Sequence, residues 1–204
     1  MTNRLITCMV LVGLLGVTSV VQAQVRYTPE GRYVGQARRP VAESDSLLAA
    51  YNSVVTLYEQ QRYEEAIDLA DELIDEDVNR KSPLLEPLYY YMGRAYMDNG
   101  ELTDAVDTFE ELLQRFPYTN FAGEVYQSEF DIAKRYLDGS YKFRLLGIPF
   151  SMAPTGRALI ERLLERAPHS SFAPEGQFLV ARYYFDSRQF SEAEMSFQQV
   201  TRLY

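Results

Sequence analysis

Small and large apolar residues recur along the chain in a frame that appears four times. A small residue opens the second half of each copy, at Ala66, Ala105, Gly156 and Ala193. A large apolar residue follows seven positions later, at Leu73, Leu112, Leu163 and Val200. This spacing keeps the apolar residues on one face of a helix, with polar residues on the other face. The pattern therefore predicts four pairs of helices that meet through small residues.

The second copy, residues 86–117, carries the clearest form of the frame. It places Tyr89, Gly93, Tyr96, Gly100 and Phe109 at the offsets of the tetratricopeptide repeat, a helix–turn–helix unit of about 34 residues. One such unit cannot bury its own apolar face, so it must stack on neighbouring units. We expect an all-α fold, an α–α superhelix of four tetratricopeptide helical hairpins. The predicted repeats are residues 47–80, 86–119, 120–170 and 171–204.

The third repeat is predicted to be interrupted. Pro117 and Pro168 lie 51 residues apart, where one repeat would span about 34. The surplus is assigned to a lengthened first helix, Asn120–Leu137, and to an insert, residues 139–155. The insert is unusually apolar for a loop and contains Phe143, Leu145, Leu146, Ile148 and Phe150. Two interpretations stay open: it folds back as a packed plug, or it is an exposed loop that binds a partner.

The first 23 residues have the features of a cleavable signal peptide. A basic start with Arg4 is followed by the apolar run Leu5–Val21 and by small residues that predict cleavage before Gln24. We therefore expect a periplasmic protein with a flexible arm at residues 24–44 and the array at 45–204. An uncleaved anchor and a lipoprotein modified at Cys8 are the alternatives. Cys8 is the only cysteine, so the mature chain would hold no disulfide.

Charge and composition argue against several classes of function. A formal net charge of −9 disfavours binding to nucleic acid. The acids between Glu64 and Asp77 alternate with apolar residues at helical spacing, so they are predicted to form a solvated helix face. His169 is the only histidine, and the sequence holds no phosphate-binding or dinucleotide motif and no zinc spacing. We expect a non-catalytic protein without cofactor, metal or small-molecule substrate.

A row of residues on the first helices is the candidate binding site. In each of the last three repeats an aromatic residue precedes a cation by four positions, at Tyr90 and Arg94, Phe130 and Lys134, and Phe178 and Arg182. Residues four apart share a helix face, so the row predicts a groove for an extended peptide with apolar and charged side chains. The alternative is pairing within each helix, as Arg94–Asp98, Lys134–Asp138 and Arg182–Asp186. A base placed before its acid is the weaker order for such pairs.

Residues 46–204 resemble the tetratricopeptide subunit of the outer-membrane β-barrel assembly machinery (BamD-like). Residues 130–170, from "FDIAKRYL" through the insert to "ERAPHS", carry this resemblance. It implies a scaffold, peripheral to the outer membrane at most, that contacts a β-barrel assembly subunit or unfolded outer-membrane proteins. The family is lipid-anchored through a cysteine at the mature N-terminus, where this chain has Gln24. The alternatives are an envelope coordinator linked to the Tol system and peptidoglycan synthesis, or a non-catalytic subunit of an enzyme complex.

Overall fold

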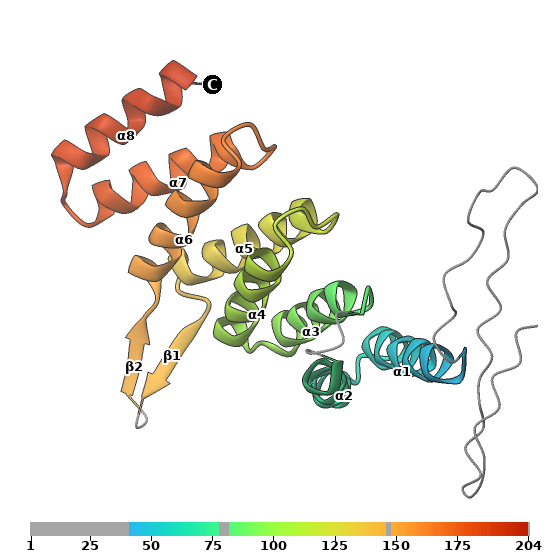
Figure 1. Cartoon of the computed structure of the whole chain (residues 1–204). Coiled ribbons are helices and arrows are strands. Elements are labelled where there is room, and N and C mark those ends of the chain that lie inside the picture. Colours follow the sequence, from blue (N-terminus) through green and yellow to red (C-terminus); the bar gives the residue numbers. More distant parts are fainter. Residues whose placement is uncertain (1–40, 78–81, 146–147, 204) are drawn as a thin grey trace, which may run out of the picture. The chain divides into compact units, whose positions relative to one another are not determined.

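The computed structural model describes residues 41–77, 82–145 and 148–203 of the chain. The chain divides between Ser44 and Asp45, and the array described below is the second of these two units, residues 45–204. Eight α-helices and one short β-hairpin occur within the described residues (Figure 1). The signal peptide, Cys8 and residues 24–40 of the predicted arm lie outside the described residues. None of the described helices is long and apolar enough to cross a membrane.

The described helices pair into four hairpins in the order of the predicted repeats. The pairs are α1 (Val41–Glu59) with α2 (Tyr63–Asp77), α3 (Leu85–Asn99) with α4 (Leu102–Arg115), α5 (Ala122–Leu137) with α6 (Ala153–Arg166), and α7 (Ala173–Asp186) with α8 (Phe190–Leu203). The predicted fold class, an α–α superhelix of four helical hairpins with an interrupted third repeat, is confirmed. Helix α1 begins at Val41, before the predicted start of the array at residue 45, and residues 41–44 contain neither proline nor glycine, which would stop a helix.

Small residues bring the two helices of a hairpin close together, as the frame predicts. A Cβ atom added to Gly93 of α3 would lie 2.5 Å from the Phe109 ring of α4. A Cβ atom added to Gly156 of α6 would lie 2.7 Å from the carbonyl oxygen of Ala133 in α5. Large buried side chains fill the space around these contacts, among them Tyr89, Phe109, Leu112, Tyr136, Ile160 and Leu163.

The turns after α1, α3 and α7 share the same two backbone hydrogen bonds. After α3, the N–H of Gly100 donates to the Met97 carbonyl and the N–H of Glu101 donates to the Tyr96 carbonyl. A residue in the left-handed region follows all four first helices: Gln61 (φ 60°), Gly100 (φ 89°), Gly139 (φ 74°) and Arg188 (φ 62°). Glycine adopts this conformation without strain, whereas other residues adopt it at a cost. The third turn differs from the others: Gly139 lies three residues after Tyr136, where the equivalent residues lie four after Leu57, Tyr96 and Tyr184, and the N–H of Tyr141 donates to the Arg135 carbonyl.

The insert forms a β-hairpin rather than an irregular loop. Strand β1 (Lys142–Leu145) pairs antiparallel with β2 (Ile148–Ser151), and Phe143 lies opposite Phe150. Alternating polar and apolar residues in Lys-Phe-Arg-Leu favour a strand, which the prediction of a loop overlooked. Helix α5 has 16 residues and α3 has 15. The surplus length therefore lies in the hairpin, and the prediction of a lengthened first helix is wrong.

Candidate functional site

Two pockets open between successive first helices of the array. The α5–α7 pocket has a volume of about 410 Å³ and is lined by Lys134, Leu137, Asp138, Ala153, Leu179, Arg182, Tyr183, Asp186 and Ser187. The α3–α5 pocket has a volume of about 510 Å³ and is lined by Arg94, Met97, Gly123, Glu124, Gln127, Ser128 and Asp131. Both pockets thus occur at equivalent seams, one repeat apart.

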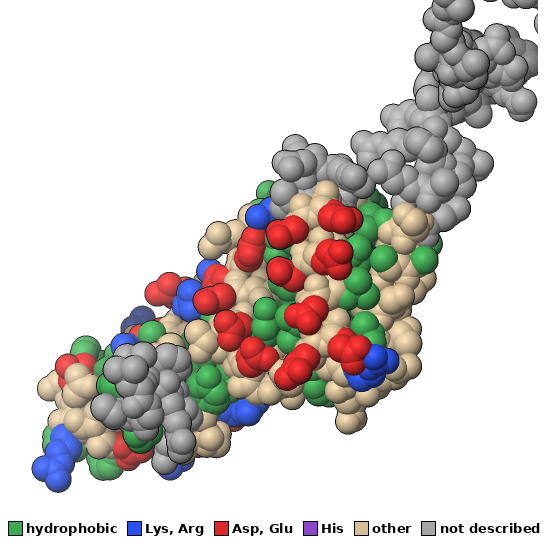
Figure 2. Space-filling view, turned by 90° about the horizontal axis from the view of Figure 1, so that it is seen from below, with side chains coloured by type: hydrophobic (Ala, Val, Ile, Leu, Met, Phe, Trp, Pro, Cys, Tyr) green, Lys and Arg blue, Asp and Glu red, His purple; other side chains and the backbone are tan. Residues whose placement is uncertain are grey.

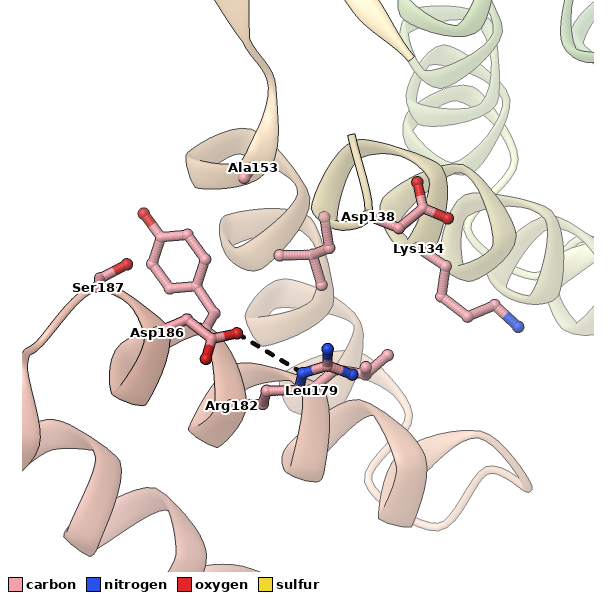
Figure 3. Close-up of a pocket in the computed structure, with 9 residues that line it drawn as sticks. Lys134, Asp138, Ala153, Leu179, Arg182, Asp186 and Ser187 are labelled. Carbon is pink, nitrogen blue, oxygen red and sulfur yellow. Dashed lines mark ion pairs between the residues drawn. The ribbon is translucent and has the colours of Figure 1, made fainter. Parts of the chain in front are cut away.

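The predicted cations line these pockets. Figure 3 shows Lys134 of α5 and Arg182 of α7 on two sides of the α5–α7 pocket. The Nε of Arg182 lies 3.6 Å from Oδ2 of Asp186, and that pair is exposed. Lys134 pairs with Asp131, with Nζ and Oδ1 3.0 Å apart, and its Nζ lies 3.9 Å from Oε1 of Glu175. Surface ion pairs of this kind contribute only about 0–1 kcal/mol, so Arg182 can exchange partners with little loss of stability. Lys134 also lies 4.7 Å from the centre of the Phe130 ring, a contact that keeps its ammonium group at the pocket.

Arg94 is more deeply embedded than the other two cations. Its guanidinium carbon lies 6.0 Å from the centre of the Tyr58 ring, and its Nη1 donates to the Tyr90 hydroxyl across 3.4 Å. Its Nη2 lies 3.7 Å from Oδ2 of Asp98, while its buried Nε has no hydrogen-bond partner. Arg94 therefore helps to hold α1 against α3, so a change at Arg94 would mix packing and binding effects.

The three predicted aromatic residues have different surroundings. Phe130 is 1% exposed, and its ring stacks on Phe172 with centres 5.0 Å apart. Its assignment to the groove is therefore corrected: Phe130 is a packing residue covered by the turn before α7. Tyr90 is half-buried and stacks on Phe121 at 4.4 Å. Phe178 is 47% exposed, so it offers the largest free aromatic surface of the three.

The β-hairpin is packed at its base and exposed along β2. Tyr141 and Met152 pack against the core at the two ends of the hairpin, and the rings of Tyr141 and Tyr136 lie 5.3 Å apart. Phe150 is 47% exposed, and Figure 1 shows the two strands extending away from α5 and α6. The side chains of Phe143, Leu145, Leu146 and Ile148 lie outside the described residues. A plug formed by those four side chains stays a prediction.

A comparison with protein-family models finds a match for one of the hairpins. Residues 88–117, which span most of α3 and α4, match the family model of the tetratricopeptide repeat. The hairpins α5–α6 and α7–α8 reuse its small-residue positions, and α7–α8 also reuses its turn. The tetratricopeptide frame therefore places Arg94, Lys134 and Arg182 at equivalent positions.

Solved structures similar to the chain include a putative kinesin light chain of Podosopora anserina with nearly identical tetratricopeptide-like repeats. The two chains are 16% identical with a TM-score of 0.48, over 77% of this chain and 74% of that chain. The MamA RS-1 ArsTM double mutant is also similar, at 16% identity and a TM-score of 0.47, over 78% of this chain and 75% of that chain. No curated protein sequence matches the chain.

The sequence pattern does not point to several of the pocket residues. Leu179 and Tyr183 of α7 line the α5–α7 pocket together with Arg182. They lie three positions before and one position after Arg182, on the edge of the same helix face. The predicted row takes one residue at each helical position, and a row that also included the flanking positions would contain Leu179 and Tyr183.

Acidic side chains gather on one face of the described part of the chain (Figure 2). The exposed acids of α2 are Glu64, Glu65, Asp68, Asp71, Glu72, Asp75 and Glu76. The apolar residues between them, such as Ile67 and Leu73, are buried. The predicted solvated helix face is confirmed for these residues, and the side chain of Asp77 lies outside the described ones.

Proposed function

We propose that the chain is a non-catalytic scaffold that binds an extended segment of a protein partner along α3, α5 and α7. This proposal rests on the lining of the α5–α7 pocket, which combines two cations with the apolar surface of Leu137 and Leu179. Such a lining accepts a peptide that has both apolar and acidic side chains. Lys134 and Arg182 would bind the acidic groups, and Phe178 would lie against an apolar one.

The α3–α5 pocket would extend this binding surface by one repeat. It offers Met97 as an apolar contact, and Gln127 and Asp131 as polar ones. An extended peptide advances by about 3.3 Å per residue, so a short segment can pass from one seam to the next. The β-hairpin would supply a second contact through Phe150 and the predicted insert residues Phe143, Leu145, Leu146 and Ile148.

We also propose export to the periplasm and a role in the assembly of outer-membrane proteins. Residues 1–23 support export, and the resemblance of residues 130–170 to the BamD-like family supports the assembly role. The partner would then be a β-barrel assembly subunit or an unfolded outer-membrane protein. Crosslinking from envelope fractions, with the chain as bait, distinguishes this role from that of a Tol-linked coordinator and from that of an enzyme-complex subunit.

Export predicts a defined mature N-terminus. When the full chain is expressed in a Gram-negative host, the protein recovered from the envelope should begin at Gln24, because signal peptidase cleaves after small residues such as Ala23. N-terminal sequencing measures this directly. A mature protein that begins at lipid-modified Cys8, or one that retains Met1, would contradict the prediction.

Removing the two cations of the α5–α7 pocket should weaken peptide binding. The probes are peptides selected on the immobilised chain from a random display library, and fluorescence anisotropy measures their affinity. The double variant Lys134→Met, Arg182→Gln should raise Kd at least about tenfold, since one lost charged hydrogen bond accounts for about 1.5–3 kcal/mol. Its melting temperature should stay close to that of the wild type, because both ion pairs are on the surface.

Matched controls separate the groove from other surfaces. Asp71→Asn changes one charge on the acidic face of α2 and should leave Kd unchanged. Phe150→Ser removes an exposed ring of the hairpin and should weaken only those peptides that also contact the hairpin. The proposal fails if the library yields no binding peptide, or if the double variant binds the selected peptides as tightly as the wild type.

A further inference from the structure

Glu129 is a buried acid in the middle of helix α5. Its side chain is 0% exposed, and neither carboxylate oxygen has a hydrogen-bond partner. Buried polar groups nearly always have such partners, and an unpaired buried carboxylate is among the most costly groups to enclose. Glu129 therefore needs a physical explanation that packing alone does not give.

The neighbours of Glu129 come from the helices on either side. Helix α4 contributes Glu110, and helix α6 contributes Arg162 and Arg166, while Tyr126 of α5 lies close to Arg166. Arg166 donates two hydrogen bonds of 2.8 Å to the two oxygens of Glu110. Arg162 pairs with the same carboxylate, with Nη1 and Oε1 2.9 Å apart. Both guanidinium groups therefore pair with Glu110, and neither forms a hydrogen bond with Glu129.

We propose that Glu129 is a proton-binding site, protonated in the folded chain at neutral pH, whose ionisation loosens the junction of α4, α5 and α6. A neutral carboxyl group has an O–H that can donate to an oxygen of Glu110, which still has free lone pairs. A negative charge beside a buried carboxyl group favours the protonated form of that group, here the fully buried Glu129. The ligand of this site is a proton. Proton binding at Glu129 does not depend on which peptide the groove binds.

Burial raises the pKa of Glu129 to about 8, and the negative charge of Glu110 acts in the same direction, against the lowering effect of Arg162 and Arg166. An unfolded glutamate has a pKa of about 4.3. Between these two values the folded chain holds a proton that the unfolded chain has lost. The folded state therefore loses stability as pH rises from about 4.3 towards 8 and regains it on acidification.

The variant Glu129→Gln tests the site. Glutamine has the shape of the protonated acid and keeps a donor for Glu110, but it cannot ionise. Between pH 5.5 and 8.5 the melting temperature of the wild-type chain should fall by roughly 5–10 °C more than that of the variant. Glu124→Gln, the same change at an exposed position of α5, should follow the wild type. Parallel melting curves for wild type and Glu129→Gln would overturn the proposal.

A direct titration decides the question even if Glu129→Gln fails to fold. Side-chain carboxyl carbons of the ¹³C-glutamate-labelled wild-type chain can be followed by NMR across the same pH range. One glutamate resonance should titrate with a midpoint near 8, and that midpoint should move to lower pH in Glu110→Gln. If every glutamate resonance titrates in the ordinary range of about 4–5, Glu129 is ionised in the folded chain and the proposal is wrong.

Discussion

Replacing Phe109 by alanine should lower the free energy of unfolding by about 3–5 kcal/mol. Phe109 is fully buried on α4, and its ring fills the space beside Gly93 of α3. Gly93 has no side chain that could move into the cavity, so the two helices would have to shift to close it. Urea denaturation measures the cost, and the slope of the transition should stay unchanged.

A matched substitution shows whether burial is the cause. Tyr118 is fully exposed in the connection between α4 and α5. The change Tyr118→Ala removes a ring of similar size and should alter stability by only about 0.5 kcal/mol. Equal costs for the two variants would mean that the seam between α3 and α4 is not closely packed around Phe109.

The variant Gly156→Val should lower the free energy of unfolding by about 3 kcal/mol, the upper end of the range for side chains forced into a packed core. Its Cβ would lie 2.7 Å from the carbonyl oxygen of Ala133 and 2.8 Å from Cβ of Tyr136. Neither atom can rotate away, because both are fixed to the backbone of α5. Helices α5 and α6 would have to separate, and thermal or urea unfolding would report the loss.

The control for Gly156→Val is the same change at Gly123, also within a helix. A Cβ atom at Gly123 would meet nothing within 4 Å. Valine has a slightly better helix propensity than glycine, so Gly123→Val should be neutral or stabilising by a few tenths of a kcal/mol, roughly. If both variants lose stability equally, β-branching rather than the close approach of α5 and α6 explains the effect.

The sequence is sufficient to predict the hairpins because their contacts are local. Gly93 meets Phe109 within one hairpin, and Gly156 meets Ala133 across another, so a frame of small and large residues contains both partners. The turn at Gly100 is equally local, since only glycine enters its backbone conformation without strain. These features need no knowledge of how one repeat lies on the next.

The sequence pattern fails to predict residues whose surroundings depend on contacts between repeats. The repeat pattern places Phe130 in the groove because its position matches Tyr90 and Phe178, but Phe172 of the next repeat covers it. Glu129 stands between Ser128 and Phe130 in a polar stretch and has no sequence feature that marks it as buried. Helical spacing defines the faces of one helix, but it does not say which neighbour covers each face.

The link between Glu110 and the two arginines has a mechanical consequence. Repeat arrays can unfold one hairpin at a time, because each hairpin contacts only its neighbours. Arg162 and Arg166 join α4 of the second repeat to α6 of the third by reaching past α5. A force that pulls on the chain must break this bridge before it can separate those repeats. Under load, we expect the second and third hairpins to stay together longer than hairpins that no such bridge joins.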